Sequence, residues 1–477
     1  MKNKRWIIPI TFISLSACLW LSLYVIEPKA LVLRFLESGN SVFLDMSPTE
    51  FIMSGLAAFK IVAWISLTVS IITALVAWLR PASVTAAAVF AFGSIVYAIS
   101  SIFVISGQST APHYVYLADA FLDGDFVLAE KPPYSEENDW TYFEGEWSVS
   151  FPPSPALLMM PFVAIWGQDF NDVIFTLLLG ALNLLLIYEL FGKICIHEKV
   201  LPVSARLFLT GAFGFGTVHW WLSTNGMVWF TAHIAAATFL LLTLIETFEK
   251  RRPWLVALWL GLAALARPPV LFALPAVIWL LRPHRSWREI GVGSLPLLAI
   301  GGLMAIYNQT RYGNPFELGY TYMKLEALLA RRVEEFGSFN TVFFKENFHH
   351  AFLNTGEWRK SFPYLVLDGW GLSLFISTPV LVCAFFAPLR EKSTQALLLG
   401  VFLVAIPNLL YYNAGYLQAG YRYALDFLPF MFSLAALAWR GRNSFLGRVL
   451  SVLSVLSILT GFLMLINSYS LYLGIIF

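Results

Sequence analysis

Residues 171–191 read NDVIFTLLLGALNLLLIYELF, a nearly continuous run of apolar side chains. As an α-helix, about twenty such residues cross the ~30 Å hydrocarbon core of a bilayer. Similar runs recur along the 477-residue chain, in which 58% of the residues are hydrophobic and 13% are charged. Soluble domains are about half apolar and about a quarter charged. The sequence therefore predicts an all-α integral membrane protein and excludes a soluble one.

About 13 transmembrane helices can be placed on these runs. They fall near residues 6–26, 56–79, 84–106, 171–191, 205–221, 227–246, 253–266, 268–281, 289–307, 369–388, 394–412, 424–439 and 447–474. The first run contains Leu15-Ser16-Ala17-Cys18, which fits a lipoprotein cleavage site. Because the apolar residues continue to Ile26, we expect an uncleaved anchor.

The lysine and arginine residues predict the orientation in the membrane. When the helices are threaded from a cytoplasmic N-terminus, one side collects 18 Lys and Arg against 6 Asp and Glu, and the other side 13 against 23. The balances are +12 and −10. Short loops rich in Lys and Arg stay in the cytoplasm. We therefore expect a multi-pass protein of the bacterial inner (plasma) membrane, with its long loops outside.

The long loops divide the chain into four parts. We expect an N-terminal transmembrane hairpin (1–83), a transmembrane core (84–307) with an external loop (107–170), a second external loop (308–368) and a C-terminal transmembrane bundle (369–477). No GxxxxGK[ST] or GxGxxG pattern occurs, which argues against chemistry driven by a nucleotide. Any chemistry is therefore expected on the external face.

The loop 107–170 has the most informative local pattern. Pro112 is placed to open a helix, and Gly124 to end it. Asp139-Trp140-Thr141-Tyr142 and Glu144-Gly145-Glu146-Trp147 then predict a turn between aromatic segments. Phe151-Pro152-Pro153-Ser154-Pro155 leads into an apolar helix from Ala156 to Trp166. That helix is too short to span a bilayer, so we expect it to lie in the interface.

This loop resembles the first external loop of the GT-C superfamily of multi-pass glycosyltransferases, which take sugars from polyprenyl-phosphate carriers. The resemblance covers roughly residues 84–440. It extends to Leu265-Ala266-Arg267-Pro268-Pro269 at the tip of two short helices, to Gly313-Asn314-Pro315-Phe316-Glu317-Leu318-Gly319-Tyr320 and to Gly420-Tyr421-Arg422-Tyr423-Ala424-Leu425-Asp426. The chain departs from the family in two ways: a hairpin (6–79) precedes the loop, and Thr110-Ala111 stands where the family has an acidic residue.

The resemblance implies a base and a set of phosphate-binding cations. The candidate bases are Asp139, His113 and Asp119, because attack by an acceptor hydroxyl requires a carboxylate or an imidazole. Arg267 and Arg422 are the candidate holders of the carrier phosphate, since the arginine fork matches phosphate oxygens. Further candidates for substrate binding are Tyr114, Glu317, Tyr320 and Lys324.

Each candidate also has a structural interpretation. His113 could cap a helix, Asp139 could make an Asx turn and Asp119 could lie on a solvated face. Asp123 and Asp125 flank the glycine that ends the loop helix, and Glu317, Tyr320 and Lys324 fit a plain turn and helix. His219 and His233 fit packed residues within helices, and adjacent His349-His350 is a weak metal motif. No cofactor is predicted firmly, although a divalent metal stays open.

The function expected from the resemblance is transfer of a sugar from a polyprenyl-phosphate donor to a lipid, glycan or protein acceptor, with no role for nucleic acid. The first alternative is a non-catalytic membrane protein that binds or translocates a lipid-linked glycan. A transporter of ions or solutes ranks last, because the helix centres carry almost no charge.

Overall fold

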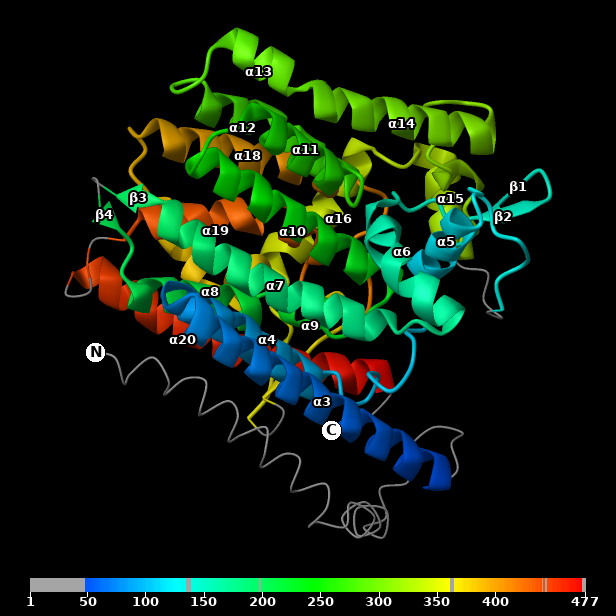
Figure 1. Ribbon diagram of the computed structural model, residues 1–477, viewed down its shortest axis with the longest axis horizontal. Helices are drawn as coiled ribbons and strands as arrows, with labels where there is room; N and C mark the ends of the chain where they lie inside the picture. Colours follow the sequence, from blue (N-terminus) through cyan, green and yellow to red (C-terminus); the bar gives the residue numbers. More distant parts are fainter. Residues whose placement is uncertain are drawn as a thin grey trace.

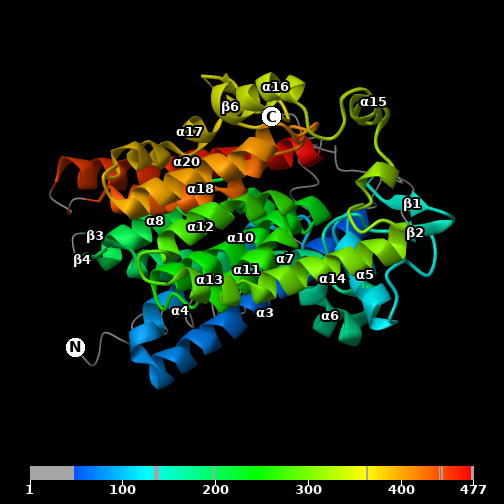
Figure 2. The ribbon, with the colours of Figure 1, turned by 90° about the horizontal axis from the view of Figure 1, so that it is seen from above.

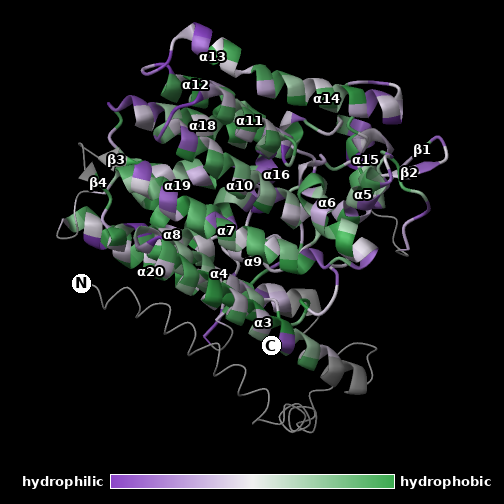
Figure 3. Cartoon of the chain, in the orientation of Figure 1, coloured by the Kyte–Doolittle hydropathy of each residue, from purple (hydrophilic) through white to green (hydrophobic). Residues whose placement is uncertain are grey.

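The structure is a computed structural model that describes residues 48–133, 139–196, 199–360, 364–439, 441 and 444–473. It is a bundle of helices with a few very short strands (Figure 1). Hydrophobic residues run along the helices, and hydrophilic ones gather in the loops at both ends of the bundle (Figure 3). The chain is therefore an all-α membrane protein in its general architecture. The first predicted span and the cleavage motif lie outside the described residues.

Long helices form the body of the bundle. They are α3 (Pro48–Leu79), α4 (Val84–Ser100), α7 (Asp172–Lys193), α10 (Val228–Phe248), α14 (Leu295–Tyr312), α18 (Lys392–Leu409) and α20 (Phe445–Leu473). Helix α10 lies at the centre, packed against α7 and α11 (Pro253–Ala264) (Figure 1). Because it is apolar on all sides, it is buried on nearly every face.

The predicted number of 13 spans is not confirmed. The described residues contain seven helices that are long and apolar enough to cross a membrane. Four predicted spans form shorter pieces instead: α8 (Val203–Phe215), α11, the 3-10 helix η4 (Pro268–Ala273) with α12 (Leu274–Leu281), and α19 (Leu428–Leu437). The predicted span 369–388 is divided into α17 (Leu374–Ser377) and a 3-10 helix, η8 (Pro379–Phe386). Proline at the start of η4 and η8 explains these breaks, since its ring cannot continue a preceding helix.

The helix, the turn between aromatic segments and the short apolar helix predicted for the first loop are confirmed, and the position of that short helix in the interface stays a prediction. Helix α5 (His113–Leu122) begins after Pro112, and Gly124 follows it with a φ of 82°. Strands β1 (Thr141–Phe143) and β2 (Glu146–Ser148) pair as an antiparallel hairpin, and α6 (Ser154–Trp166) is the short apolar helix. The loop therefore lies folded at one end of the bundle.

The second loop lies beside the first. It contains η5 (Tyr320–Tyr322), α15 (Ala327–Phe336), η6 (Thr341–Phe343), α16 (Phe344–Phe348), a π-helix, η7 (His349–Leu353), and the strands β5 (Glu357–Trp358) and β6 (Leu365–Val366). Figures 1 and 2 both show α5, α6, α15, β1 and β2 gathered at the same end of the bundle, which we call the loop end.

The opposite end carries the short turns. Strands β3 (Cys195–Ile196) and β4 (Lys199–Val200) and helix α13 (Trp287–Gly293) lie there (Figure 1). The remaining elements are η2 (Pro81–Ser83), η3 (Gly167–Asp169), α9 (His219–Ser223) and η9 (Arg422–Asp426). We call this the basic end, because Lys193, Arg251, Arg285 and Lys392 occupy its helix ends and turns.

Candidate functional site

A cavity of about 70 Å³ lies at the loop end, and segments far apart in the sequence, between Asp139 and Tyr423, form its wall. The first loop, the start of α10, the turn before η4, the second loop, the segment after α18 and η9 all contribute. The lining residues are Asp139, Phe151, Pro152, Trp229, Ala232, His233, Ala266, Arg267, Tyr320, Met323, Leu329, Tyr411, Tyr412, Asn413, Arg422 and Tyr423. We call it the loop cavity.

Asp139 is positioned by a backbone contact between the two loops. Its N–H donates to the carbonyl of Lys324 at 2.7 Å, and the N–H of Lys324 donates to the carbonyl of Trp140 at 2.8 Å. Its φ of 66° lies in the left-handed region, where aspartate is one of the residue types that occur. The two loops therefore hold this carboxyl group jointly.

Burial raises the pKa of Asp139 to about 6, although the charge of Arg422 and a hydrogen bond from the Trp229 side chain both act to lower it. A carboxylate with such a pKa accepts a proton more readily than an exposed aspartate and is still mostly ionised at neutral pH. These are the properties required of a general base.

Arg267 is held by a buried carboxylate. Its Nη2 lies 3.1 Å from Oδ2 of Asp426 and donates to Oδ1 of Asn408 at 3.2 Å. Asp426 also accepts from Nδ2 of Asn408 at 3.1 Å, and its Oδ1 lies 2.9 Å from Nδ1 of His233. Because a carboxylate only accepts hydrogen bonds, Nδ1 of His233 carries the proton here. The side chain of Asp426 is fully buried, so this network fixes the orientation of Arg267 in the cavity wall.

Arg422 is buried without such a partner. It is 7% exposed, and its guanidinium lies 5.3 Å from the ring centre of Tyr423 and 5.9 Å from that of Phe230. One weak hydrogen bond of 3.5 Å reaches the carbonyl of Tyr416. Among the described residues Arg422 makes no ion pair, and its Nε is buried without a hydrogen-bond partner. A buried cation in this state is expensive unless an anion joins it.

The segment that carries Arg422 is fixed by a close backbone contact. The N–H of Leu372 donates to the carbonyl of Ala419 at 3.1 Å. Gly371 has a φ of 78°, and a Cβ at this position would lie 2.6 Å from the Cα of Gly420. The two chain segments approach so closely because both positions are glycine.

The structure brings four of the predicted residues together: Asp139, Arg267, Arg422 and Tyr320 all line the loop cavity. His113 lies behind the wall. Its ring stacks on Trp140 at 3.8 Å, with an interplanar angle of 11°. Its edge-to-face contact with Phe151 connects it to the lining.

The other predicted residues lie outside the lining. Tyr114 is buried, with its ring 6.5 Å from that of Phe151. Asp119 accepts a hydrogen bond from Gln168 at 2.7 Å. Glu317 accepts from the N–H of Gly319 and the hydroxyl of Thr321, which is the plain turn interpretation. The ammonium of Lys324 lies 5.5 Å from the ring centre of Tyr142, so Lys324 contributes to the site through its backbone.

Several residues that line the cavity or support its wall were not predicted from the sequence. Asp426 ends the stretch Gly420–Asp426, but the sequence predicted no role for it, and His233 was interpreted as a packed residue. Asn408 near the end of α18 and Tyr411-Tyr412-Asn413 just after it follow an apolar stretch of that helix, and their polarity was a usable signal. In the described ranges no group of three His, Cys, Asp or Glu residues is arranged to hold a metal ion.

Comparison with known proteins adds no assignment: no family model, no curated protein and no solved structure matches the chain.

Proposed function

We propose that this chain is a membrane glycosyltransferase with a GT-C-like architecture, which moves a sugar from a polyprenyl-phosphate carrier to a lipid, glycan or protein acceptor outside a bacterial inner membrane. One observation carries the proposal: a carboxyl group with a raised pKa, an oriented arginine and a buried arginine that makes no ion pair with any described residue line one cavity at the loop end.

In the proposed reaction Asp139 accepts the proton of the acceptor hydroxyl as its oxygen bonds to the anomeric carbon of the donor. The bond between that carbon and the phosphate oxygen breaks, and its electron pair leaves with the carrier phosphate. Arg422 and Arg267 stabilise the charge that develops on the phosphate, because fixed cations in a partly desolvated site favour the transition state.

The loop cavity and the second loop beside it both suit an amphiphilic donor. Tyr320, Tyr411 and Tyr423 supply aromatic faces and hydroxyl groups beside the arginines. On the second loop, Leu328, Phe339 and Val342 are exposed apolar side chains, a type suited to contact with the acyl region of a membrane. The phosphate would then lie in the cavity while the polyprenyl chain stays in lipid.

The alternative is binding or translocation of a lipid-linked glycan without catalysis. Thr110-Ala111, which stands where the family has an acidic residue, favours it. The cavity, at about 70 Å³, is far below the roughly 300–1,000 Å³ typical of ligand sites, so binding of a donor requires a wider cavity for either function. The transferase requires the loop cavity to widen before a sugar enters. Leu329 of α15 is part of the lining, so movement of the second loop would enlarge the cavity.

The test uses the purified full-length chain in proteoliposomes with a panel of polyprenyl-phosphate sugars, and it measures release of polyprenyl phosphate. We expect release from one donor, and a loss of about 10²–10⁴ in rate for Asp139→Asn. Asp125→Asn is the matched control, because Asp125 accepts from the N–H of Phe126 in a turn outside the cavity.

One outcome would decide against the transferase, and another against the role of Asp139 within it. Retention of a donor with no release would favour the binding protein. Release at the wild-type rate in Asp139→Asn would assign the base to another residue and remove the role proposed for this carboxyl group.

A further inference from the structure

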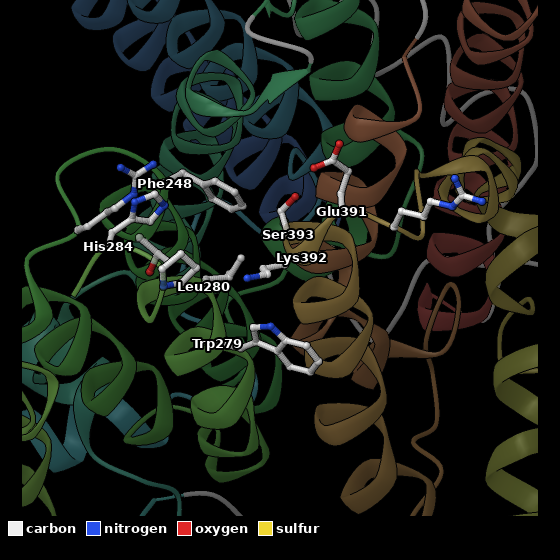
Figure 4. Close-up of a pocket in the computed structure, with 11 residues that line it drawn as sticks. Phe248, Trp279, Leu280, His284, Glu391, Lys392 and Ser393 are labelled. Carbon is white, nitrogen blue, oxygen red and sulfur yellow. The ribbon is translucent and has the colours of Figure 1, made fainter. Parts of the chain in front are cut away.

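A second cavity, of about 370 Å³, lies at the basic end. It is formed where α10 and α12 end and α18 begins, at the far end of α10 from the loop cavity. His233 and Phe248 lie at the two cavities, and the fifteen residue steps from one to the other correspond to roughly 22 Å of helix. Figure 4 shows Phe248, Leu280 and His284 on one side of this space and Lys392 and Ser393 on the other.

The rim of this cavity is cationic. Arg251, Arg390 and Lys392 line it together with one acidic residue, Glu391. The pKa of His284, also in the lining, is lowered by partial burial and by the nearby charges of Arg251 and Arg285. The local potential is therefore positive even before His284 is protonated.

The cations around the cavity are already paired, whereas those in its rim are not. Arg252 pairs with Glu246 at 2.7 Å, Lys193 with Glu249 at 2.8 Å and Arg285 with Glu289 at 3.2 Å. Within the residues that the structure describes, no ion pair involves the three rim cations. Their charge is thus available to a ligand.

Arg251 is built into the turn that forms the rim. It has a φ of 56°, and its N–H donates to the carbonyl of Glu246 at 2.7 Å. Its own carbonyl accepts a hydrogen bond from Nε of Arg285 at 2.8 Å. A residue in this left-handed conformation persists because its surroundings hold it there, as is common where chain conformation serves a site.

Another part of the cavity lining is apolar. Phe248, Leu280 and Pro283 line it beside Trp279, which is 41% exposed. At the start of α18, the N–H groups of Lys392 and Ser393 have no partner within their own helix, and this arrangement favours an anion. A cationic rim over an apolar wall fits a molecule with a phosphate at one end and hydrocarbon at the other.

We propose that the cavity at the basic end binds the phosphate headgroup of an anionic phospholipid, with its acyl chains against Trp279 and the apolar wall. The shared chemistry is a phosphate group, and the lipid is favoured over free phosphate because the wall beside the rim is apolar and open at Trp279. Basic pockets between membrane helices bind such headgroups in general. The proposal stands independently of the transferase activity.

The test titrates the purified full-length chain in detergent with three soluble probes: dihexanoyl phosphatidylglycerol, dihexanoyl phosphatidylcholine and inorganic phosphate. Binding is read from ligand-resolved native mass spectrometry. We expect phosphatidylglycerol to bind best. The double variant Arg390→Gln/Lys392→Gln should weaken it roughly 25-fold, at roughly fivefold for each cation near an anionic headgroup.

Arg288→Gln is the matched control. Arg288 lies on α13 at the same end of the bundle, is exposed and does not line the cavity, so its loss removes one charge and leaves the site intact. The site would be overturned if phosphatidylcholine bound as tightly as phosphatidylglycerol. It would also be overturned if Arg288→Gln weakened phosphatidylglycerol binding as much as the double variant does. Inorganic phosphate binding as tightly as phosphatidylglycerol would overturn the lipid as the ligand. If the double variant fails to fold, Arg251→Gln tests the same rim.

Discussion

At the loop end of α10 the charged side chains are buried and individually positioned, whereas at the basic end they stand around an open rim. Asp426 is surrounded by Arg267, His233 and Asn408 within 3.4 Å. Arg390 and Lys392 are exposed. A buried charge interacts through geometry and a low local dielectric, while an exposed one acts through a screened field. The buried network at the loop end suits catalysis at one bond of a bound substrate. The open rim at the basic end suits binding of any ligand with the right charge.

The largest difference between the two ends is expected in the free energy of unfolding, when one acidic side chain at each end is neutralised. Asp426→Asn leaves Arg267 as an uncompensated buried charge and should lower the free energy of unfolding by about 3–5 kcal/mol. Glu391→Gln, at the open rim, should change it by less than about 0.5 kcal/mol. Thermal unfolding of both variants in the same detergent measures the difference. Equal stability would mean that the buried network does not hold the loop end together.

Removal of one arginine at each end should separate the two cavities by activity. Arg422→Gln should reduce the proposed transfer by about 10²–10³, as is typical for loss of a group that stabilises developing charge. Arg390→Gln should leave the rate unchanged, since Arg390 lies at the far end of the bundle. Initial rates at saturating donor are the measurement. A similar loss in both variants would indicate a general effect of charge and not a site at the loop end.

The raised pKa of Asp139 predicts that the free energy of unfolding falls when this carboxyl group ionises. The folded-state pKa of about 6 exceeds the unfolded value of about 3.9. The stability that this group contributes is therefore fully present below pH ~4 and is lost as the pH rises through 6. Asp139→Asn should exceed the wild type in free energy of unfolding by about 2–3 kcal/mol at pH 7, with the gap closing toward pH 4. Melting curves at both pH values test it, and a gap independent of pH would contradict the assignment.

The smallest difference is expected from salt. Raising the ionic strength from about 0.05 to 0.5 M should weaken phosphatidylglycerol binding at the basic end several-fold, because exposed charges are screened. Binding of a sugar donor at the loop cavity should change less than about twofold, since Arg422 is buried and the side chain of Arg267 is 18% exposed. Titrations at both salt concentrations provide the comparison. A stronger salt effect at the loop cavity would reverse the distinction between the two ends.

Patterns that are local in the sequence predicted local structure well. Pro112 and Gly124 delimit α5, and the β1–β2 hairpin follows from the glycine turn between aromatic segments. The length of an apolar run was a poorer guide to the length of the helix, because length alone does not show where a proline or a close-packed glycine breaks the helix. For that reason runs such as 369–388 were predicted as full spans, although proline divides this one.

The site was predictable where one residue was unusual in its own surroundings. Arg267 and Arg422 stood out as charges beside apolar helix ends, and both line the loop cavity. Asp426 and His233 were not assigned, because their importance lies in a contact between positions 193 residues apart. The sequence around either residue does not predict a contact with the other. Only the packed arrangement of α10 and η9 makes them partners.

The paired backbones of Asp139 and Lys324 have a consequence for protein engineering. Because the two loops exchange hydrogen bonds at this point, neither is a self-contained module. A chimera that receives residues 107–170 alone would lose the strand-like contact that presents Asp139. A chimera that keeps this carboxyl group in place therefore has to carry residues 319–324 as well. For the same reason we expect the two segments to change together in evolution.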